Sequence, residues 1–204
     1  GPSTLRMGVE KSRNLMTVRV AQRLGFDKIS KISKDLDVYD KVPELLSVSL
    51  GSNETTLLRL TNAYCSFVNG GKKIKPILIN RIQNRRGKTI FNFDSRKCEG
   101  CELVNLKDDF TPKIIDEKEQ VISSETAYQM TSILEGVVQR GTGKKLKTLN
   151  VPLAGKTGTT NNNFDAWFIG FTSDLAIGVY VGYDEPRSLG KFETGSKAAL
   201  PIFK

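Results

Sequence analysis

The spacing of the apolar residues changes near Val151, and this change constrains the fold more than any other feature of the sequence. Before Val151, apolar residues recur with the spacing of one-sided helices. After it, short apolar runs separated by turn residues indicate strands joined as hairpins. Helices followed by a hairpin sheet predict an α+β fold with a mainly antiparallel sheet and flanking helices.

The predicted elements follow from these patterns and from turn and capping residues. Helices are expected over residues 4–24 with a break near Ser12–Asn14, over Phe26–Leu36, from Thr55 or Thr56 to Gly70-Gly71, and from Ser123 or Ser124 to Gly141-Thr142-Gly143. A hairpin is expected over Ile77–Phe93 with its turn at Arg86-Gly87, and strands over Val151–Lys156, Ala166–Phe171 and Leu175–Gly182. Residues 94–120 are charged and lack periodicity, so they are expected to form an irregular insertion.

Length and composition indicate part or all of one globular domain. The chain has 204 residues, of which 38% are hydrophobic and 26% charged, enough to form a core of its own. It has no apolar run of about 18 residues, and its polar start lacks the apolar stretch of a signal peptide. Any anchor or export signal is therefore expected outside this chain.

The basic excess of the chain suggests an anionic partner. It has 31 Lys and Arg against 22 Asp and Glu, a formal net charge of +9, which fits nucleic acid, an anionic membrane face or an anionic polymer. The basic groups are Lys72-Lys73 with Lys75, Arg85-Arg86 with Lys88, and Lys144-Lys145 with Lys147. They are scattered and lack interleaved aromatic residues that would stack on bases, so we expect no nucleic-acid partner.

The chain contains no histidine, which excludes every mechanism that uses imidazole as base, proton shuttle or metal ligand. A catalytic base must therefore be Lys, Asp or Glu. The three cysteines cannot complete a four-ligand zinc site unless a carboxylate joins them. We expect neither a metal nor another cofactor.

Gly155-Lys156-Thr157 resembles the end of a phosphate-binding P-loop. That motif needs glycine where this chain has Asn150, and no helical pattern follows, so nucleotide hydrolysis is not expected. Taken alone, Lys156 is better interpreted as a solvated charge at a strand edge. Ser12 and Asn14 could likewise cap or interrupt a helix.

Several segments, taken in order, resemble the penicillin-binding transpeptidases and serine β-lactamases, which carry out acyl transfer with serine and lysine. They are Ser12-Arg13-Asn14 (the S-x-N box), Gly51–Glu54 with the helix up to Gly71, Ala154–Thr160 (the K-T-G-T box), Asp165–Phe168, and Gly182–Pro186 with Ala198–Pro201. The last two segments resemble the end of the class A bifunctional proteins. The resemblance covers residues 1–204. It favours an active-site role for these motifs over a solvated charge at Lys156 and helix capping by Ser12 and Asn14.

The resemblance implies catalytic roles for Ser12, Asn14 and Lys156. The Lys156 ammonium would support the Ser12 hydroxyl, which would relay a proton to the leaving amine. The Asn14 amide would hold the substrate backbone.

Substrate binding is implied for Thr157, Gly158 and Thr159. The two threonine hydroxyls would bind the substrate carboxylate, and Gly158 would keep the strand edge clear. Because side chains alternate along a strand, Lys156 and Thr157 can both serve the site only if this strand lies at an edge.

The nucleophile of this family is missing from its usual place. A Ser-x-x-Lys pair precedes the S-x-N box in the family, whereas the only such string here, Ser188-Leu189-Gly190-Lys191, follows the K-T-G-T box. We interpret this string as a chance match. The chain is therefore expected to be the C-terminal part of a transpeptidase domain, incomplete at both ends and inactive alone.

Cys98 and Cys101 could be free thiols, a local disulfide or half of a metal knuckle. An enzyme outside the cytoplasm meets oxidising conditions, which favours the disulfide. Cys65 falls on a helix stripe and is expected to be an inert core thiol.

The function implied by the resemblance is that of a peptidoglycan D,D-transpeptidase that works through a serine acyl-enzyme. Its expected partners are peptidoglycan stem peptides and β-lactam antibiotics, at the periplasmic face of a bacterial inner membrane. The alternatives are a D,D-carboxypeptidase or β-lactamase of the same fold, or a non-catalytic module that binds peptidoglycan or β-lactam. Uncovered apolar faces predict that the isolated chain self-associates.

Overall fold

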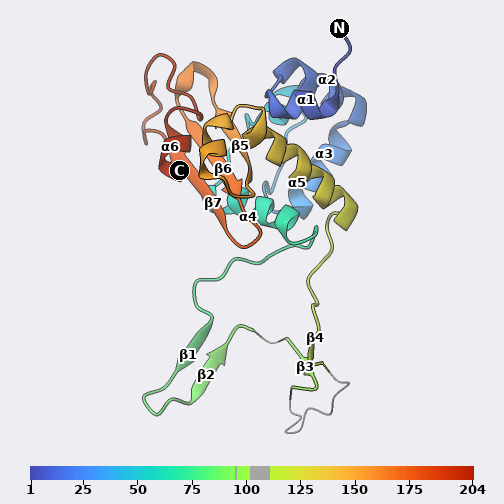
Figure 1. Cartoon of the computed structure of the whole chain (residues 1–204), viewed down its shortest axis with the longest axis vertical. Helices are drawn as coiled ribbons and strands as arrows, with labels where there is room; N and C mark the ends of the chain where they lie inside the picture. Colours follow the sequence, from blue (N-terminus) through green and yellow to red (C-terminus); the bar gives the residue numbers. More distant parts are fainter. Residues whose placement is uncertain (95, 102–110) are drawn as a thin grey trace. The chain divides into compact units, whose positions relative to one another are not determined.

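The computed structural model describes residues 1–94, 96–101 and 111–204 (Figure 1). These residues form two compact units. The main unit comprises Gly1–Ile74 and Gln120–Lys204, and the inserted unit comprises Lys75–Glu119. Within the described ranges, every helix is too short or too polar to span a lipid bilayer.

The main unit begins with a group of short helices (Figure 1). They are α1 (Leu5–Glu10), α2 (Asn14–Leu24), α3 (Phe26–Asp35) and the 3-10 helix η1 (Leu46–Leu50). Thr4 caps α1 by accepting the Met7 N–H at 3.2 Å. The predicted break in the first helix is confirmed, and it lies where Ser12 adopts a left-handed φ of 51°.

Helices α4 (Leu57–Val68) and α5 (Ser124–Gln139) begin at predicted capping residues. Thr56 accepts the Arg59 N–H and Ser123 accepts the Thr126 N–H, each at 3.2 Å. Gly71 follows α4 with a φ of 86°, and a Cβ there would overlap the main chain of Ile122. Only glycine satisfies both conditions, so the end of α4 can lie directly against the approach to α5.

The sheet of the main unit has three antiparallel strands in the order β5 (Ala154–Thr159), β6 (Ala166–Phe171) and β7 (Ala176–Val181). This arrangement confirms the predicted α+β class. The predicted strand Val151–Lys156 was wrong at both ends, because β5 pairs with the whole of β6 from Ala154 opposite Phe171 to Thr159 opposite Ala166. Pro152 has no N–H to contribute to that ladder.

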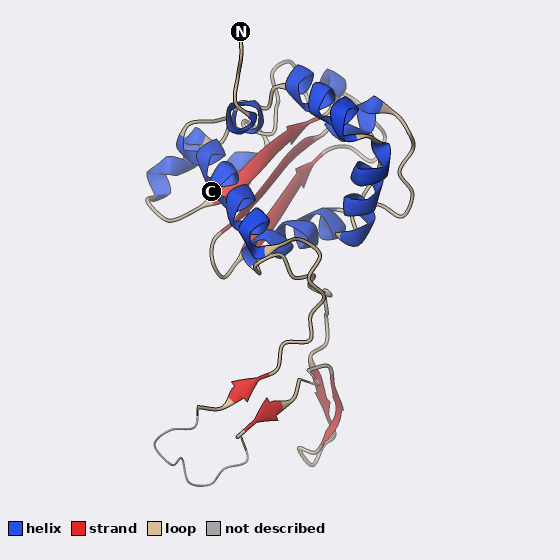
Figure 2. Cartoon of the chain, turned by 90° about the vertical axis from the view of Figure 1, so that its right-hand side faces the viewer, coloured by secondary structure: helices blue, strands red, loops and turns tan. Residues whose placement is uncertain are grey.

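Helices cover both faces of this sheet (Figure 2). On one face, Phe168 packs with buried residues of α5, of the 3-10 helix η2 (Lys144–Leu149) and of α6 (Ala199–Phe203). On the other face, Ala154 and Phe171 pack with residues of α1, α4 and α5. Since side chains alternate along β5, Lys156 shares the face of Ala154, and Thr157 shares the face of Phe168.

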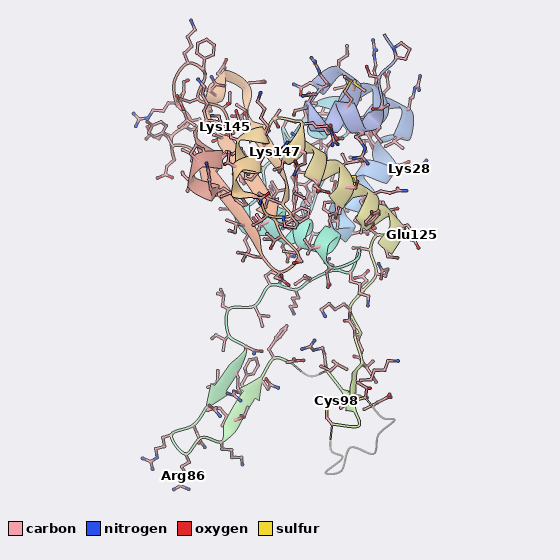
Figure 3. The ribbon with its side chains drawn as sticks, in the orientation of Figure 1. Lys28, Arg86, Cys98, Glu125, Lys145 and Lys147 are labelled. Carbon is pink, nitrogen blue, oxygen red and sulfur yellow. A yellow bond between two sulfur atoms is a disulfide. The ribbon has the colours of Figure 1, made fainter. Side chains whose placement is uncertain are left out.

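The inserted unit contains two short antiparallel pairs. They are β1 (Arg81–Gln83) with β2 (Thr89–Asn92), and β3 (Cys98–Glu99) with β4 (Lys113–Ile114). The first pair is the predicted hairpin, with Arg86 at its tip (Figure 3) and Gly87 in the turn at a φ of 78°. Its first strand is shorter than predicted, because pairing begins at Arg81 and leaves Ile77, Leu78 and Ile79 exposed outside it.

The expected irregular insertion at residues 94–120 overlaps the second half of this unit. It holds the β3–β4 pair, and Cys98 on β3 is bonded to Cys101, with a Cα–Cα distance of 5.6 Å (Figure 3). Residues 95 and 102–110 of the expected insertion lie outside the described residues.

Candidate active site

Ser12 lies in the turn between α1 and α2, with its side chain exposed. The backbone holds the turn, because the Ser12 N–H donates to the Val9 carbonyl at 3.1 Å and the Arg13 N–H donates to the Gly8 carbonyl at 2.8 Å. Asn14 begins α2 and is exposed to solvent. Its amide is therefore available to a ligand.

Lys156 lies in the middle of β5, opposite Ile169. Its Nζ donates to the Ser12 Oγ and to the Thr157 main-chain oxygen, each at 2.9 Å. Burial lowers the pKa of Lys156 from its ordinary 10.5 to about 8. The side chain is thus mostly an ammonium at neutral pH, but it gives up its proton more readily than an exposed lysine.

Thr157 and Thr159 project from the opposite face of β5, as strand alternation requires. The Thr157 Oγ1 lies 2.7 Å from the Thr142 Oγ1, within hydrogen-bond distance. The Thr159 Oγ1 accepts the Gly195 N–H at 3.0 Å. Because the Thr159 oxygen is the acceptor in that bond, its hydroxyl hydrogen stays available to donate to a ligand.

Strand β5 lies at an edge of the three-stranded sheet. This is the condition that the sequence set for Lys156 and Thr157. Gly158 lies opposite Trp167 in β6, and a Cβ on Gly158 would come within 3.1 Å of the Trp167 Cβ. The missing side chain of Gly158 therefore makes room for Trp167.

Sequence reasoning missed Glu10, Arg140, Thr142 and Gly195. Glu10 is buried, and its carboxylate accepts hydrogen bonds from Arg140, which raise the pKa of that guanidinium. Thr142 was noted only as part of a helix end, although it contacts Thr157. Gly136 was an available signal, because glycine is less favourable than alanine inside a helix and α5 nevertheless contains it.

Within the described part of the chain, no three His, Cys, Asp or Glu residues are placed to hold a metal ion. Cys65 on α4 is a free, half-buried thiol, and burial raises its pKa. A raised pKa makes the reactive thiolate scarce at neutral pH.

The family model of the penicillin-binding protein transpeptidase domain matches residues 1–204. The chain belongs to this family. Penicillin-binding protein 1A of Rickettsia bellii is 48% identical over 205 residues, which cover 100% of this chain and 26% of that protein. Penicillin-binding protein 1A of Pseudomonas aeruginosa is 36% identical over 235 residues, covering 100% of this chain and 28% of that protein.

Solved structures share the fold of this chain. The crystal structure of penicillin-binding protein 1A from Haemophilus influenzae matches with a TM-score of 0.84 at 28% identity, covering 100% of this chain and 33% of that one. The PonA1 protein of Mycobacterium tuberculosis, solved in complex with penicillin V, shares the fold with a TM-score of 0.77 at 20% identity, covering 100% of this chain and 55% of that one. The chain spans about a quarter of the length of the curated relatives named above.

Proposed function

We propose that this chain forms part of a peptidoglycan D,D-transpeptidase. Such an enzyme cross-links the bacterial cell wall by serine acyl transfer from stem peptides that end in D-Ala-D-Ala, and β-lactams block it. The observation that carries the proposal is the hydrogen bond from Lys156 Nζ to Ser12 Oγ at 2.9 Å. Acyl transfer in a chain without histidine needs another pair of groups to move a proton, and these two side chains can do so.

Proton delivery to the leaving amine is the role of this pair. During acylation the nucleophilic serine gives its proton to its paired lysine, its oxygen bonds to the scissile carbonyl carbon, the C–N bond breaks, and the amine nitrogen gains a proton. Because Lys156 donates to the Ser12 oxygen, the Ser12 hydroxyl can give its own proton to the amine and take one from the ammonium. The nucleophilic serine and its lysine are assigned to residues outside this chain, since no Ser-x-x-Lys string precedes Ser12.

We assign recognition of the substrate carboxylate to the two threonines of the K-T-G-T box, Thr157 and Thr159. Thr159 keeps a hydroxyl hydrogen to donate, and Thr157 lies on the same face of β5. The Lys156 ammonium adds a positive charge beside them, which favours an anionic ligand. The exposed Asn14 amide, on the Ser12 side, would hold the substrate backbone.

The proposed setting is the periplasmic face of a bacterial inner membrane, with the anchor outside this chain. The bonded pair Cys98 and Cys101 supports an oxidising compartment, because such bonds are rare in the cytosol. Peptidoglycan stem peptides and β-lactams are the proposed ligands, and no cofactor is required.

Covalent labelling tests the proposal. The full-length protein, treated with a fluorescent penicillin, should carry one adduct on a serine outside residues 1–204, and the 204-residue chain alone should carry none. With a D-Ala-D-Ala pentapeptide and an amine acceptor, the full-length protein should release D-Ala and form a new amide. An adduct on a serine of this chain would contradict our assignment of the nucleophile. Release of D-Ala without amide formation would indicate a carboxypeptidase instead.

A further inference from the structure

Glu10 is a buried carboxylate at the end of α1, shortly before Ser12. Only 5% of the residue is exposed. Its carboxylate accepts hydrogen bonds from Arg140 Nη2 at 2.5 Å and from Arg140 Nε at 3.3 Å. The neighbouring Lys11 donates from Nζ to the Arg140 carbonyl. A buried charge is costly to leave unpaired, so the forked contact ties the end of α1 to the end of α5.

Two glycines near the end of α5 make room for Glu10. A Cβ on Gly136 would overlap the Glu10 carboxylate, and a Cβ on Gly141 would overlap the Glu10 main-chain oxygen. Neither glycine has a positive φ, so other residues could adopt these backbone conformations. Gly136 even lies inside α5, where glycine is less favourable than alanine. Space for Glu10 is therefore the feature that these glycines supply.

The segment that follows Arg140 also reaches the strand of the K-T-G-T box. The Thr142 N–H donates to the Glu10 main-chain oxygen at 3.2 Å. The Thr142 Oγ1 lies 2.7 Å from the Thr157 Oγ1. Residues 140–142 thus contact both halves of the candidate site, the turn that carries Ser12 and the strand β5.

We propose that Glu10, Arg140 and Thr142 are positioning residues that set the placement of Ser12 relative to Lys156. This inference rests on the proposed function. None of the three residues is assigned a contact with the substrate. They act by holding the turn that carries Ser12 and the strand β5 that carries Lys156. Misplacing reacting groups by about 1 Å can slow a reaction about 100-fold. We call the contacts of these three residues with the turn and with β5 the positioning bridge. Loss of this bridge should therefore slow the chemical step and leave noncovalent binding nearly unchanged.

The test measures acylation of the full-length protein by a fluorescent penicillin at several concentrations, which separates the acylation rate constant from the noncovalent dissociation constant. Glu10→Gln keeps the volume and removes the charge, whereas Arg140→Lys keeps the charge and removes the planar fork. Each should lower the acylation rate constant about 10- to 100-fold. Arg59→Lys is the matched control, because Arg59 makes a similar forked contact with Asp40 that involves no residue of the site. It should acylate at the wild-type rate.

Gly136→Ala separates positioning from folding. Alanine favours the helix, and the atoms that its Cβ would overlap are the ends of the Glu10 and Arg140 side chains, which can move aside. We expect slower acylation, with a loss of melting temperature no larger than that of Glu10→Ala. Once Glu10→Ala has removed the carboxylate, adding Gly136→Ala should slow acylation little further, because the two changes act on one contact.

The outcomes distinguish this inference from the proposed function. A wild-type protein that forms no penicillin adduct would refute the proposed function and the positioning bridge with it. If the wild-type protein reacts and the variants Glu10→Gln, Arg140→Lys and Gly136→Ala react equally fast, the positioning bridge alone is overturned. The bridge would also be overturned if these variants acylate more slowly only in proportion to a lower melting temperature and Arg59→Lys shows the same effect.

Discussion

Lys156 and Ser12 are 144 positions apart in the sequence, yet their Nζ and Oγ atoms lie 2.9 Å apart. The contact joins the turn between two short helices to an edge strand of the sheet. Neither element would place a proton donor beside a hydroxyl on its own. The proposed proton transfer is therefore a property of the tertiary fold rather than of either motif.

The acylation rate of the full-length protein should fall as pH rises through about 8, the lowered pKa of Lys156. Below that pH the ammonium is present and can replace the proton that Ser12 gives away. Above it the neutral amine has no such proton to supply. The measurement is the acylation rate constant between pH 6 and about 9.5, a range that spans the titration.

The matched variant for this pH profile is Lys156→Arg. A guanidinium stays protonated over the whole range, so the decline near pH 8 should disappear even though the rate itself is lower. A wild-type rate that instead rises through pH 8 would show that the neutral amine acts, as a base.

Thr159→Val should destabilise the protein and weaken penicillin binding, whereas Thr159→Ser should preserve both. The Thr159 Oγ1 accepts the N–H of the buried Gly195. Valine leaves that donor unpaired, at a cost of about 1–3 kcal/mol in the free energy of unfolding. Melting temperatures and noncovalent dissociation constants of the two full-length variants check this. Equal values for valine and serine would contradict the assigned role of the hydroxyl.

Long, strongly patterned elements were predictable from the sequence. Helices α4 and α5 and strand β6 begin where caps and alternation indicated, because each buries a continuous apolar face. Strand β5 was misplaced because its limits come from pairing with β6, which no local pattern in Val151–Thr159 encodes. Ile77–Ile79 were wrongly predicted to lie in the hairpin. They have apolar, β-forming side chains but no partner strand, so they stay outside it.

The candidate site was predictable only in part. The S-x-N and K-T-G-T boxes identified Ser12 and Lys156 through resemblance. Glu10, Arg140 and Thr142 belong to no motif, and their contacts depend on how α1 and α5 pack. Periodicity cannot specify such contacts, because it says which face of a helix is buried but not which residue of another element lies against it.

Non-reducing peptide mapping of the full-length protein should find Cys98 linked to Cys101, with Cys65 free. The first pair lies in the inserted unit, whereas Cys65 lies in α4 of the main unit. Reduction should therefore leave penicillin acylation unchanged, because the site residues that this chain supplies all lie in the main unit. A mapped bridge to Cys65, or a loss of acylation on mild reduction, would be evidence against this arrangement.

The isolated 204-residue chain should self-associate. Several large apolar side chains of the main unit are more than half exposed. They include Leu5, Leu15, Leu58 and Ile202. Burying them between copies is favourable because it removes apolar surface from water. Sedimentation at rising concentration should show larger species, and a monomer at all concentrations with a concentration-independent melting transition would contradict this expectation.

The most direct test of the whole account is the acylation rate of full-length Lys156→Ala with a fluorescent penicillin, measured beside its melting temperature. Losing one well-placed charge and proton donor should slow acylation about 10²–10⁴-fold. The melting temperature should not fall much, because burial of the Lys156 ammonium is itself unfavourable and Lys156 belongs to neither apolar cluster of the core. Lys156→Arg should recover part of the charge effect but little of the geometry. A folded Lys156→Ala protein that acylates at the wild-type rate would contradict the account and leave Lys156 without a role in the chemistry.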